Sequence, residues 1–125
     1  MTIKDLIGYQ LVSIYDTIIT VRKGNSIYEL YIEQDYGGCC GFNEVSTSLL
    51  ISETEVKRNP VITDVVIENG DGDGYQTTAK ITFFGEYKTL AELNALSSSG
   101  SGWCYGASVS VVCKALDMEE IITQY

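Results

Sequence analysis

The stretch Ser26–Gln34 reads SIYELYIEQ and decides the fold expected for the rest of the chain. Its positions Tyr28, Leu30 and Ile32 are apolar, while the positions between them are mixed and include two glutamates. Successive side chains of a strand point to opposite faces of the sheet. The pattern therefore predicts a strand in an antiparallel sheet that has one face toward a core and one face toward water.

The residues before this stretch extend the same sheet. Tyr9–Thr17 and Ile18–Lys23 are rich in β-branched and aromatic residues, which is typical of strands. Gly24 and Asn25 separate the second of these segments from Ser26–Gln34. Gly and Asn tolerate the positive φ that tight hairpins require, so a hairpin is predicted here.

The second half of the chain predicts further strands and one helix. Val61–Asn69 and Gly74–Tyr87 are expected to form a hairpin, and Trp103–Leu116 a later strand. Thr89–Ser98, TLAELNALSS, predicts a helix because its leucines recur every three residues and Thr89 could cap it with a glutamate three residues on. Residues 43–60 fit either a short helix or a strand. The prediction for residues 1–125 is a single α+β domain, mainly antiparallel β-sheet with one or two short helices.

Charge and hydropathy limit the partners. The chain has 17 acidic and 8 basic residues, no histidine and a net charge of −9. Such a charge disfavours binding to nucleic acids and to anionic membrane surfaces. No apolar run approaches the roughly 20 residues of a membrane-spanning helix, and the start MTIKDLIG lacks the apolar core of a signal peptide. We expect a cytosolic protein.

The four cysteines do not form a metal-binding pattern. Cys39 and Cys40 are adjacent within DYGGCCGFN, and neighbouring side chains of an extended segment point apart, so they cannot readily chelate one tetrahedral ion. Cys104 and Cys113 would lie about 30 Å apart on one strand. Structural zinc sites prefer two to four residues between paired ligands, and no cysteine pair here has that spacing. The chain also has no histidine to add as a ligand or to activate a thiol. We expect no metal, and we expect the cysteines to lie in the core or in a glycine-framed turn.

Two short segments offer groups that suit a phosphorylated, ring-bearing ligand. Lys57 and Arg58 concentrate positive charge, and a guanidinium suits phosphate, although a solvated pair is the simpler interpretation. In AKITFFGEY, Phe83 is expected in the core. Phe84 falls on the polar face, where it could cover another element or stack on a ligand.

The glycine-rich stretch SSSGSG offers a third group. It leads through Gly102 into Trp103 and Tyr105, which places free backbone N–H groups beside two aromatic rings. The alternative is a flexible loop whose aromatic residues cap the sheet. Because the chain lacks histidine and no pair of acids lies in an apolar setting, we expect neither enzymatic activity nor a cofactor.

The order of motifs resembles that of small bacteriophage proteins of unknown function. These motifs are LIGYQLVSI, a strand ending in DYGGCCG, NPVITDVVIE, ITFFGEY and WCYG. The chain is also similar in size, β-richness and lack of catalytic residues to the Thoeris anti-defence sponges. These phage homo-oligomers sequester cyclic ADP-ribose isomers made by bacterial TIR enzymes. This resemblance implies that Phe83 or Phe84 stacks adenine, that Asn94 touches it and that Arg58 binds the phosphates.

The leading prediction is therefore a phage or prophage protein of the host bacterial cytoplasm that sequesters a cyclic nucleotide-type immune signal without degrading it. The resemblance implies a homo-oligomer, a dimer or higher. Two alternatives stay open. One is an acidic inhibitor of another protein that mimics nucleic acid through clusters such as Glu68–Asp73 and Asp117–Glu120. The other is an accessory structural domain of a phage.

Overall fold

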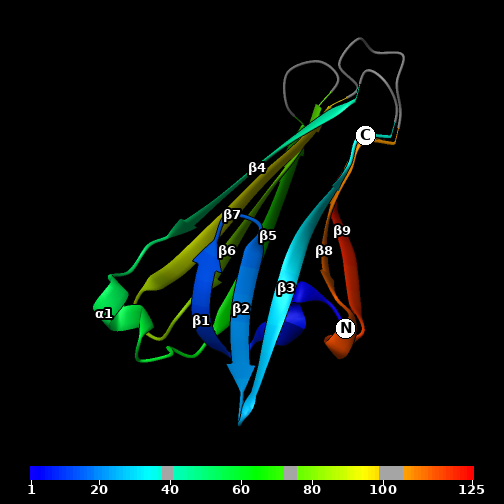
Figure 1. Ribbon diagram of the computed structural model, residues 1–125. Helices are drawn as coiled ribbons and strands as arrows, with labels where there is room; N and C mark the ends of the chain where they lie inside the picture. The colour runs from blue at the N-terminus through cyan, green and yellow to red at the C-terminus, as the bar shows by residue number, and fades with distance from the viewer. Residues whose placement is uncertain (38–40, 72–75, 99–105) are drawn as a thin grey trace.

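A computed structural model describes residues 1–37, 41–71, 76–98 and 106–125 of the chain. Within these ranges, nine strands form two antiparallel sheets that pack face to face (Figure 1). The mainly antiparallel β-structure predicted from the sequence is confirmed. The helical part is small, with one α-helix of four residues and two short 3₁₀ segments among the described residues.

The first sheet has five strands in the order β1-β2-β3-β8-β9. The second has four strands in the order β4-β7-β6-β5. The strands of the first sheet are β1 (Gln10–Tyr15), β2 (Ile18–Lys23), β3 (Ser26–Asp35), β8 (Ser108–Cys113) and β9 (Met118–Gln124). Those of the second are β4 (Phe42–Leu49), β5 (Asp64–Asp71), β6 (Gln76–Phe84) and β7 (Thr89–Ser98). The helical segments are η1 (Ile3–Leu6), α1 (Glu53–Val56) and η2 (Lys114–Leu116).

The stretch that decided the sequence interpretation is strand β3. Leu30 and Ile32 are buried, whereas Glu29 and Glu33 on the opposite face are exposed. The hairpin before it is also confirmed, because Lys23 pairs with Ser26 across a turn in which Gly24 has a φ of 63°. The predicted second hairpin is present as the antiparallel pair of β5 and β6.

The helix predicted over Thr89–Ser98 is wrong, because this segment is strand β7. It pairs with β4 on one side and β6 on the other, so both rows of its backbone hydrogen-bonding groups are used in the sheet. Ala91, Leu93 and Ala95 face the core, and the residues between them are half-buried. A central position between two strands overrides the helix propensity of Leu, Ala and Glu. The ambiguous residues 43–60 contain β4 followed by α1.

One hydrophobic cluster fills the space between the two sheets. Among its fully buried members are Leu30 from β3, Phe83 from β6 and Leu93 from β7. Segment η1 closes one end of this core with Ile3 and Leu6, and it is held there by a 2.7 Å hydrogen bond from the Ile3 N–H to a Glu120 carboxylate oxygen.

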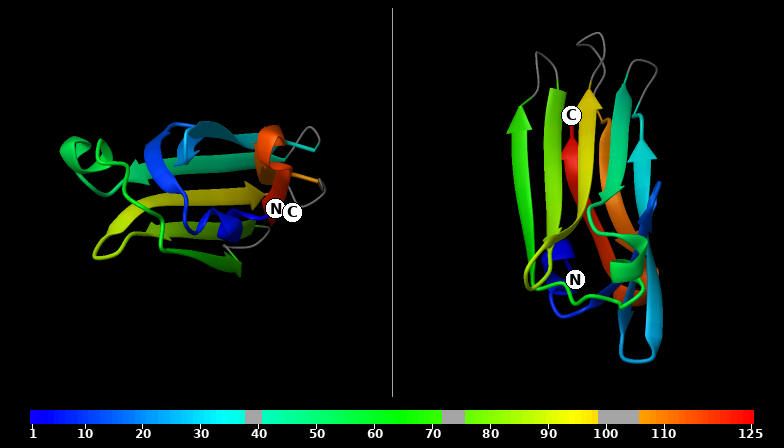
Figure 2. Two further views of the ribbon diagram at one scale, coloured as in Figure 1. Left: turned by 90° about the horizontal axis from the view of Figure 1, so that it is seen from below. Right: turned by 90° about the vertical axis from the view of Figure 1, so that its left-hand side faces the viewer.

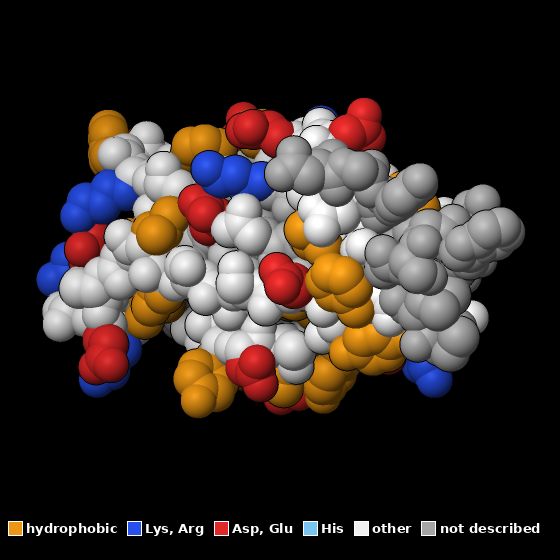
Figure 3. Space-filling view, turned by 90° about the horizontal axis from the view of Figure 1, so that it is seen from above, with side chains coloured by type: hydrophobic (Ala, Val, Ile, Leu, Met, Phe, Trp, Pro, Cys, Tyr) orange, Lys and Arg blue, Asp and Glu red, His pale blue; other side chains and the backbone are white. Residues whose placement is uncertain are grey.

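Strands β3, β5 and β7 all end at the same end of the molecule (Figure 2). The glycine-rich segments that follow them lie largely outside the described residues. Hydrophobic and acidic side chains lie side by side on the described part of the face seen from above (Figure 3). None of the helices in the described ranges is long and apolar enough to cross a membrane.

Candidate functional site

A groove of about 350 Å³ lies where α1, the segment leading to β5 and the turn between β6 and β7 meet. We call it the α1 groove. Its lining is mostly apolar and includes Ile51, Pro60, Val61 and Leu90. The charged and aromatic residues that line it are Glu55, Arg58, Glu86, Tyr87 and Lys88.

Helix α1 and its ends place Arg58 at this groove. The hydroxyl of Ser52 caps the helix by accepting a 3.1 Å hydrogen bond from the Glu55 N–H. At the other end, the Arg58 N–H donates to the Glu55 carbonyl oxygen at 3.1 Å. Asn59 then adopts a φ of 50° and turns the chain away, as residues in the left-handed region commonly do after a helix. The turn that follows α1 therefore places Arg58 at the groove.

The turn between β6 and β7 supplies the other side of the groove. The Gly85 N–H donates a 2.7 Å hydrogen bond to the Lys88 carbonyl oxygen and closes the turn. A Cβ at Gly85 would lie 2.8 Å from Cδ2 of the buried Leu90, so any other residue at this position would force the Leu90 side chain to shift. The turn projects Tyr87 outward with 89% of its surface exposed.

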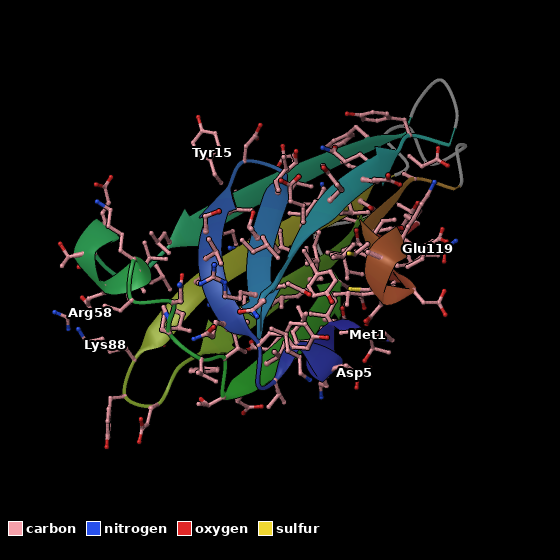
Figure 4. All side chains as sticks on the ribbon, turned by 60° about the horizontal axis from the view of Figure 1, so that its bottom comes forward. Met1, Asp5, Tyr15, Arg58, Lys88 and Glu119 are labelled. Carbon is pink, nitrogen blue, oxygen red and sulfur yellow. The ribbon has the colours of Figure 1, made fainter. Side chains whose placement is uncertain are left out.

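The charges of the groove are distributed unevenly. Lys88 Nζ lies 2.6 Å from a Glu55 carboxylate oxygen, and this hydrogen bond holds the pKa of Glu55 below its usual value. Arg58 has no ion-pair partner among the described residues. Glu86 also lines the groove. The two glutamates and the two cations that line it therefore have a net charge of zero. The groove thus holds one paired cation, one unpaired guanidinium and one exposed ring. Figure 4 shows Arg58 and Lys88 at the same end of the molecule, below α1.

The structure does not bring all the sequence-predicted residues together. Phe83 has no exposed surface and belongs to the core, so it cannot stack on a ligand. Phe84 is half-buried, and its carbonyl oxygen accepts a 2.8 Å hydrogen bond from the Thr63 N–H, but its side chain does not line the α1 groove. Lys57 is exposed on the solvent side of the same helix end and also does not line it.

Asn94 lies in a different place from Arg58. It stands on the outer face of β7 and donates a 2.8 Å hydrogen bond to a Glu92 carboxylate oxygen. There it lines a wide, polar hollow of about 900 Å³ together with Lys80 and Glu68. Of the set that the resemblance implies, Arg58 alone lies in the α1 groove. Gly102, Trp103 and Tyr105, like Cys39 and Cys40, fall outside the described residues.

Sequence reasoning missed Tyr87 and Lys88. The signal was present as the turn GEYK, an exposed aromatic and a cation that follow a glycine between two β-segments. Tyr87 was expected as the last residue of the strand Gly74–Tyr87, and Lys88 fell between that strand and the helix expected over Thr89–Ser98, so neither was expected in a hairpin turn. With β7 as a strand, Tyr87 and Lys88 lie in its turn with β6, and both line the groove beside α1.

Of the four cysteines, Cys113 lies among the residues that the structure describes. Cys113 is buried in the core with a free thiol, as expected. The described residues contain no group of three acidic, histidine or cysteine side chains that could hold a metal ion.

No family model, no curated protein and no solved structure matches this chain. The chemistry of the described surface is therefore the basis for assigning a function.

Proposed function

We propose that the α1 groove binds a small ligand that carries a planar ring and a phosphate group. One observation carries this proposal. The unpaired guanidinium of Arg58 and the exposed ring of Tyr87 line the same apolar groove. In a ligand that has a planar ring and a phosphate, the phosphate would bind the guanidinium and the ring would stack on Tyr87.

Each half of the pair has a physical role. A guanidinium offers several N–H donors in a planar fork that matches phosphate oxygens. An aromatic ring that stacks on a base contributes roughly 1–3 kcal/mol. The apolar lining from Ile51, Val61 and Leu90 would exclude water from one side of the ligand, which strengthens the charge interaction.

The groove also suits a small ligand by its volume. At about 350 Å³ it falls at the lower end of the range of small-molecule sites. A cyclic nucleotide-type signal, such as a cyclic ADP-ribose isomer, would place one base and its phosphates in the groove and leave the rest exposed. Because Lys88 already pairs with Glu55, the phosphates would first engage Arg58.

The protein would act by sequestration and not by catalysis. A phage or prophage protein in the cytoplasm of a host bacterium could lower the free concentration of an immune signal by binding it intact. This is the function implied by the resemblance to the Thoeris anti-defence sponges. The homo-oligomer that the same resemblance implies stays a prediction, which light scattering on the purified protein would test.

The first experiment isolates the ligand. Protein purified from cells with an active TIR defence would be heat-denatured, and the released small molecules would be analysed by mass spectrometry. We expect an intact nucleotide in stoichiometric amount from the wild-type protein and a strongly reduced amount from Arg58→Ala. The matched control is Lys57→Ala, which removes the same charge one residue away but does not touch the groove. An empty wild-type protein, in cells where the signal is demonstrably made, would contradict the proposal.

A further inference from the structure

A second candidate site lies on the outer face of the five-stranded sheet. There β8 has short side chains, Ser108 and Ser110, between the longer side chains of β3 and β9. The strand register places Ser110 between Glu33 and Ile121. The result is a hollow of about 790 Å³ that runs along β8, which we call the β8 trough.

The trough is acidic. Glu33 and Asp35 line it from β3, and Glu119 lines it from β9. All three are exposed, and no lysine or arginine is among the described residues that line it. Within the described chain, neither Glu33 nor Glu119 forms an ion pair. Asp35 accepts a 2.9 Å hydrogen bond from the Gly37 N–H.

A row of apolar side chains borders the trough, and of its members Tyr31 is exposed while Ile18 and Val112 are half-buried. The register aligns Ile18 with Tyr31 and Tyr31 with Val112 across three strands, and Glu119 follows on the fourth. Tyr31 is 45% exposed, and its hydroxyl donates a 2.6 Å hydrogen bond to Glu29. Ile121, on the other side of the trough, is 52% exposed. Tyr31 and Ile121 therefore expose apolar surface on the two sides of the trough, where apolar side chains of a partner can pack.

The charge of the trough decides what it can bind. Nucleic acid and a second copy of this chain would both bring further negative charge against Glu33 and Glu119. A divalent ion lacks a set of converging ligands among the described residues. An arginine or lysine side chain, by contrast, would gain carboxylate partners in the trough and could place an apolar neighbour on the row.

We propose that the β8 trough binds a basic segment of another protein. Arginine or lysine side chains of the segment enter between β3 and β9, and its apolar side chains rest on the row of Ile18, Tyr31 and Val112. This site shares no lining residue with the α1 groove, so it is a further activity and does not depend on the ligand proposed there. It would suit an inhibitor that covers the basic surface of a partner.

The test uses a blocked peptide of alternating arginine and leucine, titrated by calorimetry into the whole protein at low salt. The trough variant is Glu33→Gln with Glu119→Gln. The matched control is Glu44→Gln with Glu68→Gln, which removes the same charge from the outer face of the other sheet. We expect the trough variant to bind at least about tenfold more weakly and the control to change less than about twofold.

A second peptide, of alternating arginine and glycine, separates the contribution of the trough to peptide binding from that of the apolar row. We expect the wild-type protein to prefer the arginine–leucine peptide, and Tyr31→Ser to abolish that preference while the protein stays folded by circular dichroism. Equal weakening by the trough and control variants would show only non-specific attraction to an acidic protein and would overturn the proposal. Absence of binding to either peptide would overturn it as well.

Discussion

At the scale of single residues, one buried hydroxyl ties together four strands of both sheets. Ser97 on β7 has no exposed surface and donates a 2.7 Å hydrogen bond to Asn43 Oδ1 on β4. Because its one proton is used there, the Thr123 hydroxyl on β9 donates to Ser97 across 2.7 Å. Asn43 Nδ2 in turn donates to the Asp35 carbonyl oxygen of β3 at 2.9 Å. Every member of this network needs the others, since buried polar groups without partners are costly.

Ser97→Ala should therefore destabilise the protein by about 1–3 kcal/mol, because it leaves buried groups of Asn43 and Thr123 without a partner. Urea unfolding followed by circular dichroism would measure the change. The matched control is Ser46→Ala on neighbouring β4, where the side chain is exposed and the expected change lies within about 0.5 kcal/mol. Equal effects of the two substitutions would show that the network does not contribute.

Substitutions at two residues of the α1 groove should change the ligand affinity in opposite directions. Arg58→Ala removes the unpaired cation and should weaken binding of cyclic ADP-ribose by about tenfold or more, in line with a hydrogen bond to a charged group. Glu55→Gln releases Lys88 from its ion pair and should strengthen binding, because a second cation becomes available for phosphate. Calorimetric titration would give both values. Weaker binding by Glu55→Gln would show that the ligand does not approach Lys88.

At the scale of elements, the ion pair between Glu55 and Lys88 joins α1 to the turn between β6 and β7. It holds the pKa of Glu55 below the ordinary value of 4.5. Since the folded pKa is the lower one, the stabilisation is present above the unfolded value and is lost as the pH falls through the folded pKa. A carboxyl-carbon NMR titration should place the Glu55 midpoint below 4.5, and Lys88→Met should move it upward. An unchanged midpoint in the variant would mean that the pair does not persist in solution.

Comparing the predicted with the observed strands shows which parts of the fold local sequence patterns can predict. The alternation in Ser26–Gln34 and the Gly24-Asn25 turn are local signals, and both predicted the observed strand and hairpin. Strand β7 was missed because leucine spacing fits a helix as well, and only pairing with β4 and β6 decides between the two. Arg58 was found by its charge, whereas its neighbour Tyr87 depends on that long-range pairing. No local pattern could place β8 between β3 and β9, so the trough was not predicted.

At the scale of the whole molecule, the two candidate sites lie on different sheets and at different sides. Figure 4 shows Arg58 and Lys88 on one side of the view and Glu119 on the other. The hydrophobic cluster between the sheets separates them. Because the two sites share no lining residue, they are expected to bind their ligands independently.

The final prediction is that the protein binds a nucleotide and a basic peptide at the same time without coupling. Cyclic ADP-ribose affinity, measured with and without saturating arginine–leucine peptide, should differ by less than about twofold. Arg58→Ala should change the peptide affinity by less than about twofold, and the Glu33→Gln, Glu119→Gln variant should change the nucleotide affinity by less than about twofold. These reciprocal controls are needed because both substitutions alter the charge of an acidic protein and shift all affinities slightly. If saturation with peptide blocks the nucleotide, the two ligands compete for one surface and the separation into an α1 groove and a β8 trough is wrong.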